Sequence, residues 1–210
     1  MRKLVLKMSV SIDGFVGGPN GEVDWLIRNM DDRAAIWVVD TLRQAGVHIM
    51  GSRTYHDMAA YWPTSTEPFA APMNEIPKVV FSRKGLSSST ATTTTALRDA
   101  SRIRDARGDV PAPLSPSANT WTEAVIARDL VEEIARLKQQ DGKIILAHGG
   151  AGFVQSLVEH DLVDEYRLLV HPVVLGRGLP IFSRAASFDV KLVSTTAFPS
   201  GSVANVYQRR

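Results

Sequence analysis

Three apolar segments of the chain are followed directly by residues that suit an anionic ligand. Residues 51–54 read Gly-Ser-Arg-Thr, residues 82–84 read Ser-Arg-Lys, and residues 148–152 read His-Gly-Gly-Ala-Gly. Glycine lets a ligand approach the backbone closely, a guanidinium binds phosphate, and the free N–H groups of a first helical turn favour an anion. Each segment alone is equally typical of a capped strand or a solvated turn. Because ligands of open α/β sheets bind at the carboxyl ends of strands, the three together predict a site for a ligand with several phosphate groups.

Lys7 lies in the middle of the first predicted strand. Residues 4–12 alternate, with Leu4, Leu6, Met8, Val10 and Ile12 on one face and Val5, Lys7, Ser9 and Ser11 on the other. A lysine inside a sheet needs solvent or an anionic partner, because burial of an unpaired ammonium is costly. The position therefore indicates either a half-exposed strand or a lysine that contacts a substrate.

The composition is typical of a globular protein without nucleic-acid or membrane partners. The 210 residues are 44% hydrophobic and 22% charged, and the formal net charge is +2. The Lys and Arg residues are scattered, so no nucleic-acid-binding surface is predicted. The absence of cysteine excludes disulfides and thiolate metal sites, and we expect no metal. No apolar run approaches the roughly 18 residues that a membrane helix needs, so we expect a cytoplasmic protein.

Strands and helices are predicted to alternate along the chain. Further strands are expected near residues 47–50, 78–82, 144–147, 164–170, 189–196 and 203–208, and helices near residues 31–45, 129–140 and 153–162, with a shorter one from residue 51. This order predicts one α/β domain over residues 1–210. We expect a three-layer α/β/α sandwich with a mostly parallel central sheet and an antiparallel C-terminal edge hairpin. Residues 85–120 are rich in Ser, Thr and Pro and are predicted to form a surface insertion.

The order of these motifs resembles the dihydrofolate reductase superfamily, and in particular the reductase domain of bacterial riboflavin biosynthesis and its free-standing relatives. Residues 7–14 (Lys-Met-Ser-Val-Ser-Ile-Asp-Gly) are similar to that domain's opening strand. Residues 51–55 (Gly-Ser-Arg-Thr-Tyr) resemble the Gly-Arg-x-Thr cofactor turn, and residues 148–150 resemble the Gly-Gly segment. Residues 162–165 and 171–178 resemble the late signature. The resemblance covers nearly the whole chain outside residues 85–120.

The resemblance implies NADPH as the cofactor. The cofactor-binding residues that it implies are Ser9, Val16, Gly17, Gly51, Arg53, Thr54, Ser82, Arg83, Gly149, Gly150, Ala151, Gly152 and Phe153. Ser82 and Arg83 would bind the 2′-phosphate, and the two basic residues after the third strand favour NADPH over NADH. The resemblance also implies a cis peptide bond between Gly149 and Gly150.

On the substrate side, the resemblance implies that Lys7 faces a small-molecule substrate. Trp25 either closes over the pocket or is a buried structural residue. His148 stands where the riboflavin reductases usually carry an acid, and this histidine either donates a proton near neutral pH or caps the strand. Folate enzymes bind and protonate the pterin with a carboxylate of the first helix, which makes Asp32 a catalytic candidate. Asp31 and Asp32 are also typical of helix caps.

The sequence thus predicts an NADPH-dependent oxidoreductase of the pyrimidine reductase type of riboflavin biosynthesis. It would transfer a hydride to a small nitrogen heterocycle or its ribosyl group. A dihydrofolate reductase or another NADPH reductase is the alternative within this class. A non-enzymatic nucleotide-binding module is the alternative outside it, because the family's substrate-binding arginines are not evident at residues 55–60, although Lys7 argues against it. The resemblance also implies a homodimer.

Overall fold

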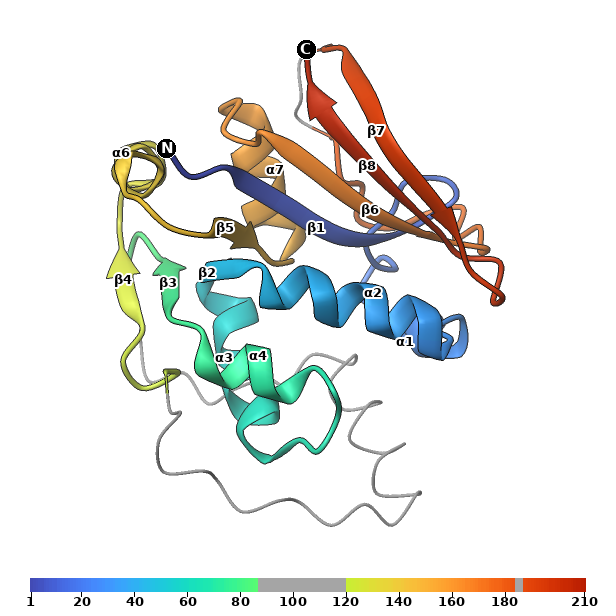
Figure 1. Ribbon diagram of the computed structural model, residues 1–210, viewed down its shortest axis with the longest axis horizontal. Coiled ribbons are helices and arrows are strands. Elements are labelled where there is room, and N and C mark those ends of the chain that lie inside the picture. Colours follow the sequence, from blue (N-terminus) through green and yellow to red (C-terminus); the bar gives the residue numbers. More distant parts are fainter. Residues whose placement is uncertain (87–119, 184–186) are drawn as a thin grey trace.

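The computed structural model describes residues 1–86, 120–183 and 187–210, which form one mixed sheet with helices on both faces (Figure 1). The strands are β1 (Leu4–Ser11), β2 (Ala45–Gly51), β3 (Lys78–Phe81), β4 (Val125–Ala127), β5 (Ile144–Ala147), β6 (Glu165–His171), β7 (Val190–Ala197) and β8 (Val203–Arg209). The helices are α1 (Asp24–Arg28), α2 (Asp32–Arg43), α3 (Ser52–Tyr61), α4 (Ala70–Glu75), α6 (Leu130–Gln139) and α7 (Ala151–Glu159), with a 3₁₀ turn at Trp62–Thr64. The strand order is β4-β3-β2-β5-β1-β6-β8-β7.

Strand β1 lies between β5 and β6 and is parallel to both. Its predicted alternation is confirmed, because Leu4, Leu6 and Met8 join one buried cluster while Val5 joins another. Lys7, with the same parity as Val5, therefore faces the side of the second cluster. Since a parallel strand is flanked by neighbours whose carboxyl ends lie at the same edge, residues after β1, β2, β3 and β5 gather at one edge of the sheet.

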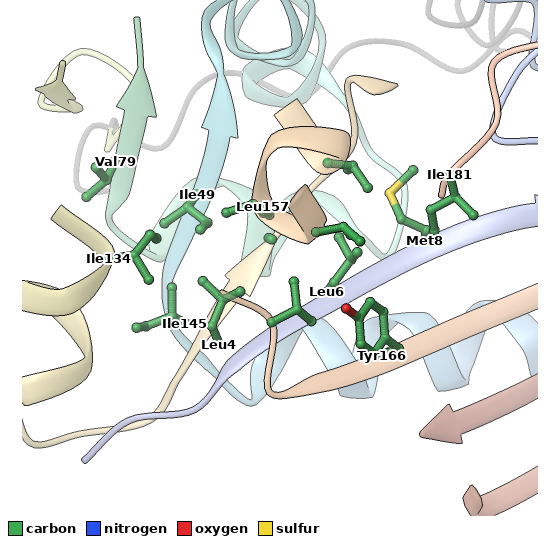
Figure 2. Packing of buried hydrophobic residues seen from close by; sticks show 14 of the residues in the cluster. Leu4, Leu6, Met8, Ile49, Val79, Ile134, Ile145, Leu157, Tyr166 and Ile181 are labelled. Carbon is green, nitrogen blue, oxygen red and sulfur yellow. The ribbon is translucent and has the colours of Figure 1, made fainter. Parts of the chain in front are cut away.

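The two buried clusters lie on opposite faces of the sheet and define the three layers. On one face, the apolar stripes of α6 and α7 supply Ile134, Val154 and Leu157, which pack over Leu6 and Ile145 (Figure 2). On the other face, the cluster contains buried residues of α2 and α4 together with partly buried residues of α3; these helices contribute Ala34, Val38, Leu42, Met73, Tyr55 and Met58. The predicted sandwich is thus confirmed (Figure 1).

The predicted C-terminal hairpin is also confirmed. Strand β8 pairs antiparallel with both β6 and β7, and the β7–β8 connection turns at Gly201 with φ +83°. A positive φ favours glycine, so the Pro-Ser-Gly sequence of this connection fits its geometry. The other strand pairs of the described sheet are parallel.

Three short elements were not predicted from the sequence, namely α1, α4 and β4. Each has three to six residues, too few for a helical or alternating pattern to be distinctive. The predicted insertion at residues 85–120 falls largely on residues 87–119, which lie outside the described part of the chain. Among the described residues, no helix is long and apolar enough to cross a membrane.

Candidate functional site

The start of α3 and the turn between β5 and α7 meet at the carboxyl edge of the sheet. The Thr54 hydroxyl donates a hydrogen bond to the Gly149 carbonyl over 2.8 Å. Gly150 has φ +100°, and a Cβ there would lie 2.6 Å from Thr54 Oγ1. A Cβ on Gly51 would lie 3.2 Å from the Cβ of Phe153. Only glycines allow this approach, so the structure brings together two of the three segments that the sequence singled out.

The third segment joins this edge through an aromatic contact. Phe81, the last residue of β3, stacks on Phe153 at a ring-centroid distance of 5.4 Å and an angle of 25°. Ser82 then closes a turn, because its hydroxyl donates to the Gly85 carbonyl over 2.7 Å. Arg83 is exposed, as is Arg53 in the first turn of α3, and neither forms an ion pair with a described residue. Within the described part of the chain, both guanidinium groups are therefore available to an anion at this edge.

The loop after β1 packs against the loop after β6. The Asp13 carboxylate accepts hydrogen bonds from the backbone N–H groups of Leu175 and Gly176, at 3.2 and 2.7 Å. The Ser11 side chain lowers the pKa of Asp13 most, and these two N–H groups lower it further. The Val16 N–H donates to the Leu179 carbonyl, and a Cβ on Gly178 would overlap the Gly17 carbonyl oxygen. Asp13 thus fixes the position of the loop that carries Val16 and Gly17.

Lys7 lies half-buried on the face of the sheet that α2 covers. Leu6 of β1 pairs with Ala147, the last residue of β5. Lys7 therefore lies beside His148, which follows β5 directly. Burial lowers the pKa of Lys7 to about 8. No described residue forms a hydrogen bond or ion pair with its ammonium group, and Ser9 lies buried two residues further along the same face. An ammonium group in this setting is available to a ligand.

His148 is buried and touches a second histidine that the sequence did not predict to be part of the site. Its Nε2 lies 2.6 Å from Nδ1 of His48 in β2. Burial lowers the pKa of both rings, that of His48 to about 3, and positive groups nearby lower them further. For His148 these groups are His48, Lys7 and Lys78. This environment favours the neutral form of both rings, and the alternative roles of His148 as proton donor or strand cap stay predictions.

Trp25 is buried, with 2% of its surface exposed, and its indole N–H donates to the Glu22 carbonyl. Its ring lies edge-on to His171, at the end of β6, with a centroid distance of 5.4 Å. This environment favours a buried structural role for Trp25 over closure above the pocket. His171 is fully buried, and burial together with the charge of Lys7 lowers its pKa to about 4.

Asp31 is the N-cap of α2. Its carboxylate accepts from the Ala34 N–H over 2.9 Å and from the Ser200 N–H over 2.7 Å. The Ser200 side chain lowers the pKa of Asp31 most, and together with these N–H groups it brings the pKa to about 2. Asp32 is exposed in the first turn of the same helix. The cap interpretation of Asp31 is thus confirmed, whereas a catalytic role of Asp32 stays a prediction.

The implied cis bond between Gly149 and Gly150 is not present, since the described residues contain no cis peptide bond. The chain changes direction there through the positive φ of Gly150 instead. Residues 149–153 nevertheless form the predicted junction between a strand and a helix, with Gly150 as the N-cap of α7 and Ala151 as its first residue. A Cβ on Gly152 would meet no atom within 4 Å, so the outer side of this turn is open.

Three buried basic residues were missed by sequence reasoning, namely His48, Lys78 and His171. Each stands on a strand at the parity that faces α2 and α4, as Lys7 does. Lys78 bonds to the Ile76 carbonyl and to Thr120, lies over the Trp121 ring at 4.4 Å, and has its pKa lowered by burial to about 7. Polar residues inside otherwise apolar strands were the available signal.

The site's open edge fits the phosphates of a dinucleotide. Gly51 and Gly150 let α3 pack closely against the turn before α7, and a Cβ on Gly152 would meet no atom within 4 Å, so the first turn of α7 is accessible from outside. Arg53 and Arg83 are exposed at the same edge. The fold and this edge define a dihydrofolate reductase-like α/β protein.

The chain belongs to the RibD C-terminal domain family, whose family model matches residues 2–204. It is 32% identical to the uncharacterized protein YyaP of Bacillus subtilis (strain 168) over 208 residues, which cover 98% of this chain and 94% of the relative. The resemblance to the superfamily that the sequence suggested is thereby confirmed.

Solved structures share the fold at low identity. A putative riboflavin biosynthesis protein from Shewanella sp. PV-4 matches with a TM-score of 0.67 and 17% identity, over 100% of this chain and 99% of the other. The diaminohydroxyphosphoribosylaminopyrimidine deaminase/5-amino-6-(5-phosphoribosylamino)uracil reductase of Thermotoga maritima matches with 0.65 and 17%, over 100% of this chain and 57% of the other. Dihydrofolate reductase from Enterococcus faecalis, complexed with NADP(H), matches with 0.57 and 11%, over 99% and 96%.

Proposed function

We propose that this protein is an NADPH-dependent reductase of the pyrimidine reductase type, which transfers a hydride to a small nitrogen heterocycle or its ribosyl group. The observation that carries the proposal is the shared edge. The glycine-lined junction of α3 and α7 lies at the carboxyl ends of the strands whose buried face holds Lys7. A phosphate-binding edge beside a desolvated ammonium group is what a reductase of a polar substrate needs.

Each part of the site has a role in this proposal. The N–H groups at the start of α7 and the guanidinium groups of Arg53 and Arg83 bind the cofactor phosphates, and Ser82 holds the turn that carries Arg83. Val16 and Gly17 border the nicotinamide end from the loop that Asp13 fixes. When bound, NADPH supplies the hydride.

Lys7 orients the substrate and holds a proton at Nζ. Its pKa of about 8 keeps it mostly protonated at neutral pH, yet lets it release the proton more easily than an exposed lysine. An amine in this range can therefore donate a hydrogen bond to a substrate carbonyl or imine, and transfer the proton as negative charge develops there.

A titration of the purified protein with NADPH and NADH, followed by nicotinamide fluorescence, tests the cofactor half of the proposal. We expect Arg83→Ala to weaken NADPH binding about tenfold and NADH binding much less, because one charged contact to the 2′-phosphate is lost. Arg43→Ala is the matched control, since Arg43 is an exposed arginine at the end of α2, away from the site. Binding of neither nucleotide would refute the proposal.

The nucleotide-binding module remains the competing function, and turnover distinguishes it. A module would bind NADPH but oxidise none of it across a panel of heterocycles with C=N or C=O groups. The half-buried Lys7 without a described partner favours the enzyme, because a protein gains no stability from a desolvated lysine.

A further inference from the structure

His48 and His148 form a buried pair whose hydrogen bonds can be followed proton by proton. His48 is fully buried and His148 is 6% exposed. The rings lie 4.6 Å apart at an angle of 57°, with Nε2 of His148 2.6 Å from Nδ1 of His48. A single proton can lie between two nitrogens at this distance, and it is covalently bonded to one of the two rings.

The Pro72 carbonyl decides the tautomer of His48. Its oxygen lies 3.2 Å from Nε2 of His48, and a carbonyl oxygen only accepts. Nε2 of His48 therefore carries a proton. A neutral imidazole has one N–H group, so Nδ1 of His48 is a lone-pair acceptor, and the proton between the rings belongs to Nε2 of His148. By the same count, Nδ1 of His148 is unprotonated.

The surrounding charges keep both rings neutral. The ionisable groups that act on His148 are Lys7 from β1, His48 from β2 and Lys78 from β3, and all three are basic. Burial disfavours the charged form of each ring most, and a further positive charge among these groups would be unfavourable as well. The carboxylate of Glu165 on the same face is bonded to Arg167 at 2.7 Å, so it does not offset them.

The tautomer of His171, on the other side of Lys7, is assigned from its hydrogen bonds in the same way. Its Nδ1 lies 3.4 Å from the Ser202 hydroxyl, whose own proton is donated to the Asn29 carbonyl over 2.9 Å. Nδ1 of His171 is therefore the donor, and Nε2 is a lone-pair nitrogen. It is buried without a hydrogen-bond partner among the described residues. Both histidines whose pKa the charge of Lys7 lowers thus carry an acceptor nitrogen for which the described residues supply no hydrogen bond.

We propose that His48 is a positioning residue that fixes His148 as its Nε2–H tautomer, so that His148 carries an unprotonated Nδ1 on the face of the sheet that holds Lys7, where we place the substrate. His148 then accepts a hydrogen bond from an N–H or O–H group of the ligand, and it is not the proton donor of the reaction. The ligand group next to it is a neutral donor and not a carboxylate or phosphate, because a lone pair repels an anion. The ligand half of this inference rests on the proposed reductase function; the tautomer does not.

Long-range ¹H–¹⁵N correlation spectra of the histidine side chains in the free protein test this directly, because protonated and lone-pair nitrogens have well-separated ¹⁵N shifts. Loss of one set of signals in His148→Gln identifies that ring. We expect a protonated Nε2 and a lone-pair Nδ1 for His148 at pH 7. A protonated Nδ1, or an imidazolium, would overturn the proposal.

Two variants separate positioning from simple folding. His48→Asn keeps an acceptor oxygen near the place of Nδ1, and we expect the His148 tautomer to be retained. His48→Leu removes the acceptor, and we expect the separated shifts of His148 to collapse toward averaged values. His160→Gln, at the exposed end of α7, is the control and should leave them unchanged. Identical His148 spectra in all variants would contradict the role of His48.

NADPH titration of the same samples keeps this result distinct from the proposed function. If the wild type shows the predicted tautomer but binds no NADPH, the reductase proposal fails while the role of His48 stands. If the wild type binds NADPH but His148 carries a protonated Nδ1, the role of His48 fails while the reductase proposal stands.

Discussion

The two halves of the site are built in opposite ways. The edge formed by α3, β3 and α7 consists of glycines, a threonine–carbonyl bond and a phenylalanine stack, and its cations are exposed. The face under α2 and α4 instead holds five basic residues on or directly after strands, namely the half-buried Lys7 and the buried His48, Lys78, His148 and His171. The first half needs shape and backbone groups, whereas the second holds titratable groups that are kept from charging.

The difference indicates where the fold gives up stability for function. Burial of groups that would rather be charged is unfavourable, and such groups persist mostly where a ligand uses them. In the edge formed by α3, β3 and α7, hereafter the glycine edge, only the backbone geometry lowers the stability of the fold. Variants and conditions that act on one half alone therefore test this comparison.

Acid should affect the buried basic face most strongly. The pKa values of His48 and His171 are lowered from 6.5 to about 3 and about 4, so the unfolded chain binds protons first as the pH falls. Stability is then full above about pH 6.5 and is lost below it, by about 2 kcal/mol for each group between pH 7.5 and pH 5. Urea unfolding at these two pH values measures the loss. Equal stability at both would show that the rings are not desolvated.

Lys7→Met should separate activity from stability. We expect turnover to fall at least about 100-fold, because the ammonium group that we propose orients the substrate is lost. We expect the free energy of unfolding at pH 7 to rise by about 1–3 kcal/mol, because a half-buried ammonium is replaced by an apolar chain. Lys3→Met, at an exposed residue just before β1, is the control and should change neither quantity much. A destabilised Lys7→Met would indicate a structural lysine.

The glycine edge should respond to a single methyl group. Gly150→Ala places a Cβ 2.6 Å from Thr54 Oγ1 at a residue with φ +100°, and we expect it to lower the free energy of unfolding by about 1–3 kcal/mol. Gly152→Ala is the matched control two residues later, where a Cβ meets nothing within 4 Å. In the helix it should be neutral or slightly stabilising. Equal losses in both variants would contradict the close contact of α3 with this turn.

The same contrast explains what the sequence could predict. The glycine edge was predictable because its signals are local: each glycine or hydroxyl follows a strand directly. The alternation of β1 likewise placed Lys7 on the correct face. The pairing of His48 with His148 was not predictable, because it depends on how β2 and β5 align across 100 residues of sequence. The short β4 and the actual geometry of the Gly149–Gly150 turn also depend on tertiary contacts.

The most direct test of the proposed cofactor site is to follow backbone amide signals by NMR while NADPH is added. We expect the largest changes at residues 51–54 and 149–153, at the junction of α3 with the β5–α7 turn. Smaller changes are expected for residues 82–83. Changes confined to another surface, such as the groove lined by Arg2, Arg43 and Lys143 at the opposite ends of the strands, or no change at all, would contradict it.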